Sequence, residues 1–207
     1  MATWSDGRDV TNPLIHWPSP PPWGWRADDL DHLPADGPNG EFDFFQRVEL
    51  MDGALVFGSP QTAFHQRVTH GIAKRLIAQS PGHQTPVVRM DVKLNDRTRS
   101  CPDVLVIDAA VAEDGDRTFY TADEVHLVVE VTSAESEERD RRYKPLRYAE
   151  AGIAHFWRVE EKDGRPVVYV YELDPATKAY ALTGIHHGKL SVPVPFEIGI
   201  DLDALPR

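Results

Sequence analysis

The stretch Leu127-Val128-Val129-Glu130-Val131 is the most apolar of the 207-residue chain, and one carboxylate interrupts it. A continuous apolar run of this length is typical of a strand that is buried on both faces of a sheet. A carboxylate inside such a strand is costly unless a lysine or a metal ion pairs with it. Glu130 is therefore a candidate functional residue. The alternative is a glutamate at a strand end that faces solvent or pairs with an arginine.

A second carboxylate stands at the start of another apolar run. Pro102-Asp103 directly precedes residues 104–107, which predict a second buried strand. A proline is tolerated at the first residue of a strand, because the ladder there need not take an N–H group. Pro-Asp alone is common and carries little information. If this strand lies next to the strand of Glu130, however, the carboxylates of Asp103 and Glu130 would lie close together.

A lysine follows on a predicted helix that spans residues 135–151. Asp140, Lys144 and Tyr148 are spaced at i, i+4 and i+8, which places them on one helix face. The simpler interpretation is a surface ion pair between Asp140 and Lys144, worth only a few tenths of a kcal/mol. Glu49, which directly precedes a hairpin signal, and His65, at the edge of an apolar helix stripe, are weaker candidates.

The remaining elements predict a mixed α/β domain. Asp52-Gly53 lies between two short apolar runs and indicates a hairpin. Ser59-Pro60 is typical of an N-cap and a first helical position, and an apolar stripe with four-residue spacing predicts a helix over 60–79. Alternation of Val88, Met90, Val92 and Leu94 predicts one half-buried strand. Further strands are expected at 154–159, 167–173 and 179–182.

Composition and charge limit the kinds of function. With 41% hydrophobic and 27% charged residues, the chain is long enough for one α/β domain over 41–207. Residues 1–40 form a Pro- and Trp-rich arm, whose tryptophans, Trp17, Trp23 and Trp25, are expected to pack on the domain, with Trp23 and Trp25 buried against it or against a second subunit. The alternative is an arm that binds a partner. No segment predicts a membrane span or a secretory signal, and a single cysteine fits the cytoplasm. The net charge of −11 argues against binding nucleic acid by overall positive charge.

Several of these residues occur in an order that resembles the Uma2 family, over roughly residues 42–160. The family belongs to the PD-(D/E)XK nuclease superfamily, so the resemblance implies a restriction-endonuclease-like core: a mixed central β-sheet flanked by two main helices. The elements that carry it are, in order, Val48-Glu49-Leu50-Met51-Asp52-Gly53, Ser59-Pro60, His65, Pro102-Asp103-Val104, Val129-Glu130-Val131, Asp140, Lys144, Tyr148, Ala151-Gly152 and Phe156-Trp157.

The resemblance also implies a site and an activity. Asp103 and Glu130 match the two acidic positions, and Lys144 replaces the lysine that normally follows the second acid by two residues, where Thr132 stands. Glu49 and His65 match accessory positions. The implied protein is an endonuclease that uses Mg²⁺ or Mn²⁺, held by Asp103, Glu130 and the carbonyl of Val131. DNA is a more fitting substrate than RNA, and a homodimer is expected by analogy alone.

Two other functions fit the same residues. A catalytically idle or regulatory module on this fold would bind a protein partner, and the acidic balance of the chain favours it. Hydrolysis of a phosphate ester other than nucleic acid would also need two carboxylates and a metal ion. A zinc site is disfavoured by the single cysteine and the lack of paired histidine spacing, and the G-x-x-x-x-G-K-[S/T] phosphate loop is absent.

Overall fold

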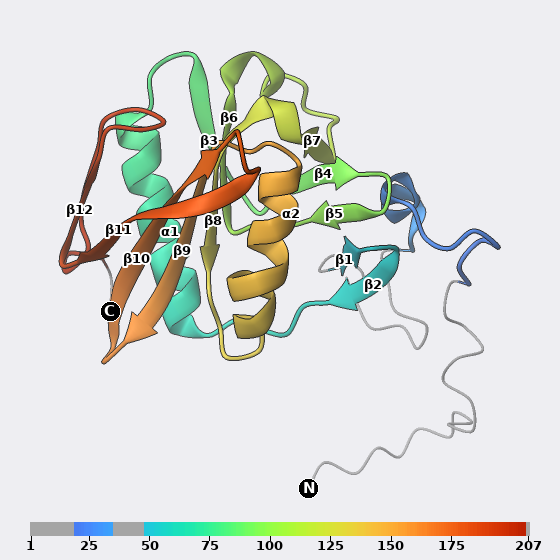
Figure 1. The fold of residues 1–207 in the computed structure, drawn as a ribbon, viewed down its shortest axis with the longest axis horizontal. Coiled ribbons are helices and arrows are strands. Elements are labelled where there is room, and N and C mark those ends of the chain that lie inside the picture. The colour runs from blue at the N-terminus through green and yellow to red at the C-terminus, as the bar shows by residue number, and fades with distance from the viewer. Residues whose placement is uncertain (1–18, 35–47, 206–207) are drawn as a thin grey trace, which may run out of the picture.

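A computed structural model describes residues 19–34 and 48–205, in which a six-stranded mixed sheet forms the centre (Figure 1). Its strand order is β11-β10-β9-β8-β6-β3, and only the β8–β9 pair is parallel. The strands are β3 (Gln84–Val88), β6 (Val104–Asp108), β8 (Val125–Val131), β9 (His155–Lys162), β10 (Arg165–Asp174) and β11 (Ala179–His187).

Two helices cover the two faces of this sheet, as the sequence predicts. Helix α1 (Ala63–Gln79) packs on the face formed by alternate residues such as Val104, Val106 and Val129. Helix α2 (Lys144–Glu150) packs on the opposite face through Tyr148 (Figure 1). Burial on both faces explains why β6 and β8 are continuous apolar runs in the sequence.

A second, five-stranded sheet has the order β2-β1-β5-β4-β7. Its strands are β1 (Val48–Met51), β2 (Ala54–Phe57), β4 (Asp91–Asn95), β5 (Thr98–Ser100) and β7 (Phe119–Thr121). A hairpin of β12 (Lys189–Val192) and β13 (Ile198–Asp201) adds apolar side chains to the core beside α1. Short 3₁₀ helices lie at Ala27–His32 (η2), Ala109–Val111 (η4) and Ala122–Glu124 (η5).

The predicted hairpin is confirmed between β1 and β2. Asp52 and Gly53 have φ angles of 50° and 85°, so both take the left-handed conformation of a type I′ turn. The guanidinium of Arg97 lies against this turn, and a Cβ on Gly53 would clash with it. Arg97 also donates a hydrogen bond to the Trp23 carbonyl at 2.7 Å, which holds the N-terminal segment on the second sheet.

Three predicted boundaries are wrong in detail. Helix α1 begins at Ala63 rather than residue 60, because Thr62 is the N-cap and its side chain accepts a hydrogen bond from the His65 N–H. The single strand predicted through Val88 and Leu94 is two strands in different sheets, since Arg89 (φ 54°) breaks it. The second predicted helix includes a π-helical segment, η6 (Arg139–Tyr143), directly before α2.

The N-terminal arm departs from the expected packing. Trp17 lies outside the described residues. Trp25 is half-buried, but Trp23 is 62% exposed and so does not pack on the domain of its own chain.

The apolar stripe of α1 provides a test of the fold. Replacing Ile72, which is fully buried, by alanine should lower the free energy of unfolding by about 2–5 kcal/mol, because a cavity forms between α1 and the sheet. The matched control is Ile77→Ala on the same helix, where the side chain is 57% exposed and the loss should stay below about 1 kcal/mol. Urea unfolding measures both, and equal losses would contradict the packing of α1.

Candidate functional site

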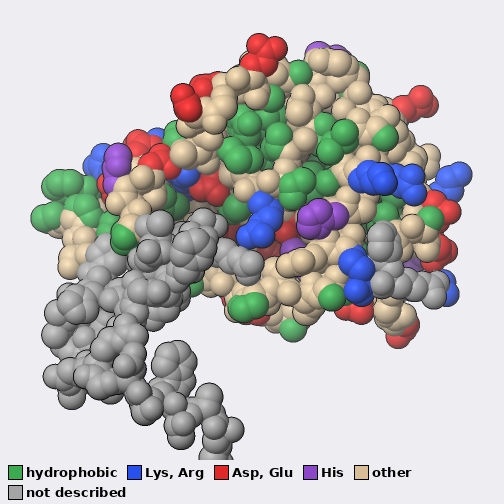
Figure 2. All heavy atoms as spheres, turned by 180° about the vertical axis from the view of Figure 1, so that it is seen from behind, with side chains coloured by type: hydrophobic (Ala, Val, Ile, Leu, Met, Phe, Trp, Pro, Cys, Tyr) green, Lys and Arg blue, Asp and Glu red, His purple; other side chains and the backbone are tan. Residues whose placement is uncertain are grey.

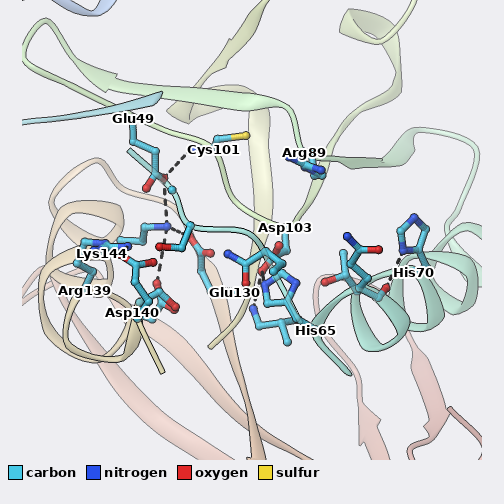
Figure 3. A pocket seen from close by; sticks show the side chains of 18 residues that line it. Glu49, His65, His70, Arg89, Cys101, Asp103, Glu130, Arg139, Asp140 and Lys144 are labelled. Atoms are coloured by element: carbon cyan, nitrogen blue, oxygen red, sulfur yellow. Dashed lines mark hydrogen bonds and ion pairs between the residues drawn. The ribbon is translucent and has the colours of Figure 1, made fainter. Parts of the chain in front are cut away.

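A cavity of about 260 Å³ opens beside the end of β8, and all five candidate side chains line it (Figure 3). Its walls come from α1, from the connection between β5 and β6, and from the segment of residues 135–144. Glu49 is contributed by β1 of the second sheet, and Glu130 by β8 of the first. The cavity therefore lies where the two sheets meet.

The centre of the site is a buried ion pair. The ammonium of Lys144 lies 2.9 Å from Oε1 of Glu130, and these side chains are 6% and 5% exposed. The hydroxyl of Tyr148 donates to the same oxygen at 2.6 Å. Lys144 and Tyr148 reach Glu130 together because they are one helical turn apart on the face of α2 that covers the sheet.

Lys144 holds two further carboxylates close to this pair. Its ammonium lies 3.1 Å from Oε1 of Glu49 and 3.7 Å from Oδ1 of Asp140. Glu49 also accepts a hydrogen bond from the Cys101 N–H at 2.8 Å, and Asp140 accepts one from the Ser136 hydroxyl at 2.5 Å. One ammonium is thus shared by three carboxylates, and all of these contacts fix its position.

Burial and charge determine the protonation of the pair. Burial raises the pKa of Glu130 well above its usual value, and the ammonium of Lys144 opposes this rise. Burial by itself lowers the pKa of Lys144, but the carboxylates of Glu130 and Glu49 outweigh it and raise that pKa well above its usual value. Burial also raises the pKa of Tyr148. Lys144 therefore stays charged at neutral pH, and Tyr148 remains a donor.

Asp103 lies beside Glu130 at the end of the sheet. Val104 pairs with Val129, so the antiparallel register places Asp103 opposite Glu130, with both side chains on one face. Oδ2 of Asp103 accepts a hydrogen bond from the Val131 N–H at 2.8 Å and lies 3.1 Å from Nε2 of His65. Glu49 and His65, the weaker candidates from the sequence, thus also belong to the site: Glu49 contacts Lys144, and His65 contacts Asp103.

The donor atoms fit a hard divalent cation. The contacts given above use Oε1 of Glu130 and Oδ2 of Asp103, so Oε2 and Oδ1 are the candidate donors to a ligand. The carbonyl of Val131 points to the same side as its N–H, toward Asp103, since the next N–H along the strand bonds to β9. Two carboxylates and a carbonyl suit Mg²⁺ or Mn²⁺ completed by water.

Among the described residues, no group of three or more His, Cys, Asp or Glu side chains is arranged to hold a metal ion. A cation here would therefore depend on the Val131 carbonyl and on water for its remaining ligands.

Several other residues that line the cavity were not predicted from the sequence. Arg89, His70 and Arg139 line it together with Ser136 and Cys101. Arg89 lies within a strand-like alternation and Arg139 lies in a charged helical segment, so neither position differs from an ordinary surface arginine in the sequence. Only the break between β3 and β4 and the π-helical segment bring them to the cavity.

The sheet, its two covering helices and the cluster of carboxylates around one lysine define a nuclease-like α/β protein. The model of the Uma2 family, described as "Putative restriction endonuclease", matches residues 40–204, and the chain belongs to this family. No curated protein matches the chain. In the described residues, no helix is long and apolar enough to cross a membrane.

A solved structure supports the fold. It is a putative nuclease belonging to DUF820 from Anabaena variabilis ATCC 29413, which is similar with a TM-score of 0.60 and 14% sequence identity. The similarity covers 81% of this chain and 88% of that chain. At this identity, the comparison shows the restriction-endonuclease-like architecture alone.

The buried pair gives a pH-dependent prediction. In Lys144→Met the counter-charge that lowers the pKa of Glu130 is lost, so this folded-state pKa rises further above the unfolded value of about 4.3. When the pKa of a carboxyl group is higher in the folded than in the unfolded state, the free energy of unfolding falls as the pH rises from the unfolded-state pKa to the folded-state pKa. Relative to the wild type, the free energy of unfolding of the variant should be lower by about 3–5 kcal/mol at pH 8, but by less than about 1 kcal/mol at pH 4.

Urea unfolding at both pH values, in the presence of a chelator, measures this difference. The control is Lys74→Met, because Lys74 is exposed on α1 and its loss should be small at either pH. A loss in Lys144→Met that is the same at pH 4 and pH 8 would contradict the charged pair.

Proposed function

We propose that this chain is a Mg²⁺- or Mn²⁺-dependent endonuclease that hydrolyses phosphodiester bonds, in DNA rather than RNA. The observation that carries the proposal is the Glu130–Lys144 pair, which lies beside Asp103 in the cavity. The family model and the similar nuclease structure support the same class of activity. A homodimer, which would allow both strands to be cut, and a cytoplasmic location belong to the proposal.

Asp103, Glu130 and the carbonyl of Val131 are the groups that would hold the metal ion. When bound, such a cation supplies polarisation of the phosphate and lowers the pKa of a coordinated water. The protein keeps the two carboxylates oriented for this role. Tyr148 and Lys144 fix Oε1 of Glu130, while His65 and the Val131 N–H fix Oδ2 of Asp103.

Lys144 would position the attacking water or stabilise the charge that develops on the phosphate in the transition state. A lysine two residues after Glu130 would lie on the same face of β8 as this glutamate, because side chains alternate along a strand. Thr132 stands there instead, and α2, which covers that face, supplies the ammonium. The helix thus provides the cation that the strand lacks.

The alternative function is a catalytically idle or regulatory module that binds a protein partner. The net charge of −11 favours it. Against it, Figure 2 shows Lys, Arg and His side chains among the acidic ones on the face opposite to that of Figure 1, so this face does not carry one sign of charge.

The central test is a cleavage assay on single- and double-stranded DNA and RNA with Mg²⁺, Mn²⁺ or chelator. We expect cleavage of DNA with either metal and none with chelator. Glu130→Ala should abolish cleavage, because it removes a metal ligand. Lys144→Ala should lower the rate by about 10²–10³-fold, the usual loss for one partner of the transition-state charge.

Glu161→Ala serves as the control, because this exposed glutamate on β9 lies outside the cavity and its loss should leave the rate unchanged. A wild-type protein that cleaves no nucleic acid with any divalent metal would exclude the proposal and favour the partner-binding module. Cleavage by Glu130→Ala at the wild-type rate would place the activity elsewhere.

Metal binding should also stabilise the fold, since a ligand that binds only the folded state adds free energy by mass action. At a metal concentration of 100 times Kd the gain is about 2.7 kcal/mol, which thermal melting detects. The gain should disappear in Asp103→Asn combined with Glu130→Gln and persist in Glu161→Ala. An equal gain in the double variant would mean that the metal binds elsewhere.

A further inference from the structure

Arg89 is the residue at which the chain leaves the six-stranded sheet for the five-stranded one. It follows β3 directly, and β4 begins two residues later. Its backbone N–H donates to the carbonyl of Asp103 at 3.2 Å, so the residue is joined to the segment that carries a proposed metal ligand. Its side chain is exposed and lines the cavity.

Among the described residues, the guanidinium of Arg89 has no carboxylate partner, unlike that of Arg139, the other arginine that lines the cavity. Arg139 donates to Glu135 at 2.7 Å. Within residues 19–34 and 48–205, no carboxylate forms an ion pair or hydrogen bond with the side chain of Arg89. An unpaired guanidinium offers five N–H donors, which match the oxygens of a phosphate.

The charges in the cavity are separated in space. The carboxylates of Glu49, Glu130 and Asp140 surround Lys144, whereas Arg89 lies on the other side of Asp103 (Figure 3). His70 lies on this second side as well (Figure 3). A polyanion that placed one phosphate at Asp103 and Glu130 would bring a neighbouring phosphate toward Arg89, away from the carboxylates.

The backbone of Arg89 is in the left-handed region, with φ of 54°. For a residue other than glycine, aspartate or asparagine this conformation is uncommon and strained. Glycine would adopt it at no steric cost. The backbone conformation therefore gives no reason for arginine rather than glycine at this position.

We propose that Arg89 binds a backbone phosphate of the nucleic acid next to the one that is cleaved, on the side of the cavity where His70 also lies. This inference rests on the proposed function, because it assumes that the phosphate to be cleaved binds at Asp103 and Glu130. It assigns the cavity two parts: an acidic one that takes the metal ion, and a basic one that takes the chain of phosphates.

The sharpest variant is Arg89→Gly, because it removes the guanidinium and also relieves the backbone strain, so its melting temperature should equal or exceed that of the wild type. Binding to a fluorescein-labelled DNA duplex and to its single strand is measured by anisotropy. Ca²⁺ replaces Mg²⁺ in this assay, since it also takes oxygen ligands. Arg89→Lys tests rescue by a positive charge, and Arg165→Ala, an exposed arginine on β10, is the control.

We expect Arg89→Gly to bind about tenfold more weakly, and the slope of log K against log salt to fall by about one, as for the loss of one phosphate contact. Arg89→Lys should recover most of the affinity, and Arg165→Ala should bind like the wild type. With Mg²⁺, Arg89→Gly should raise KM about tenfold and change kcat less than about threefold, which separates binding from catalysis.

The outcomes separate the two proposals. If the wild type binds DNA without cleaving it, the hydrolytic function is excluded. If Arg89→Gly then binds more weakly than this wild type, the role of Arg89 in phosphate binding is still supported. Wild-type affinity and salt slope in Arg89→Gly would overturn the role of Arg89, whether or not the protein cleaves. A wild-type protein that binds neither form of DNA would overturn it as well.

Discussion

The ion pair between Lys144 and Glu130 is the contact on which both the core and the site depend. Three carboxylates lie around one ammonium, in a place where burial makes each unpaired charge costly. Tyr148 makes the same contact part of the packing of α2, because its ring lies in the core while its hydroxyl bonds to Glu130. The helix cannot move away from the sheet without separating these charges.

The cavity lies where the two sheets meet. Glu49 comes from β1, whereas Glu130 comes from β8 and Asp103 directly precedes β6, so neither sheet alone holds the carboxylates. The chain passes between the sheets at Arg89, where it takes a left-handed conformation. Strain of this kind persists only where the surrounding structure fixes it. Here β3, β4 and the hydrogen bond to the Asp103 carbonyl do so.

The sequence predicts those parts of the fold that depend on local patterns. The hairpin at Asp52-Gly53, α1, and the strands around Glu130 follow from turn chemistry and apolar spacing. The break at Arg89 could not be predicted, because the apolar alternation continues through it. The π-helical segment could not be predicted either, because the i, i+4 spacing of Asp140 and Lys144 is also typical of one face of a regular α-helix. Distant contacts decide both features.

The charge that acts on a bound phosphate is that of the cavity rather than that of the whole chain. At physiological salt, charges more than about 8 Å apart are largely screened, so a phosphate in the cavity responds to the cavity and not to the net charge of −11. That cavity holds more carboxylates than cations. A phosphodiester would be repelled from Asp103 and Glu130 unless a divalent cation came between them. The acidic cavity is therefore a physical reason for metal dependence in the proposed reaction. Arg89, which has no carboxylate partner among the described residues, is where we propose that attraction for a polyanion remains without metal.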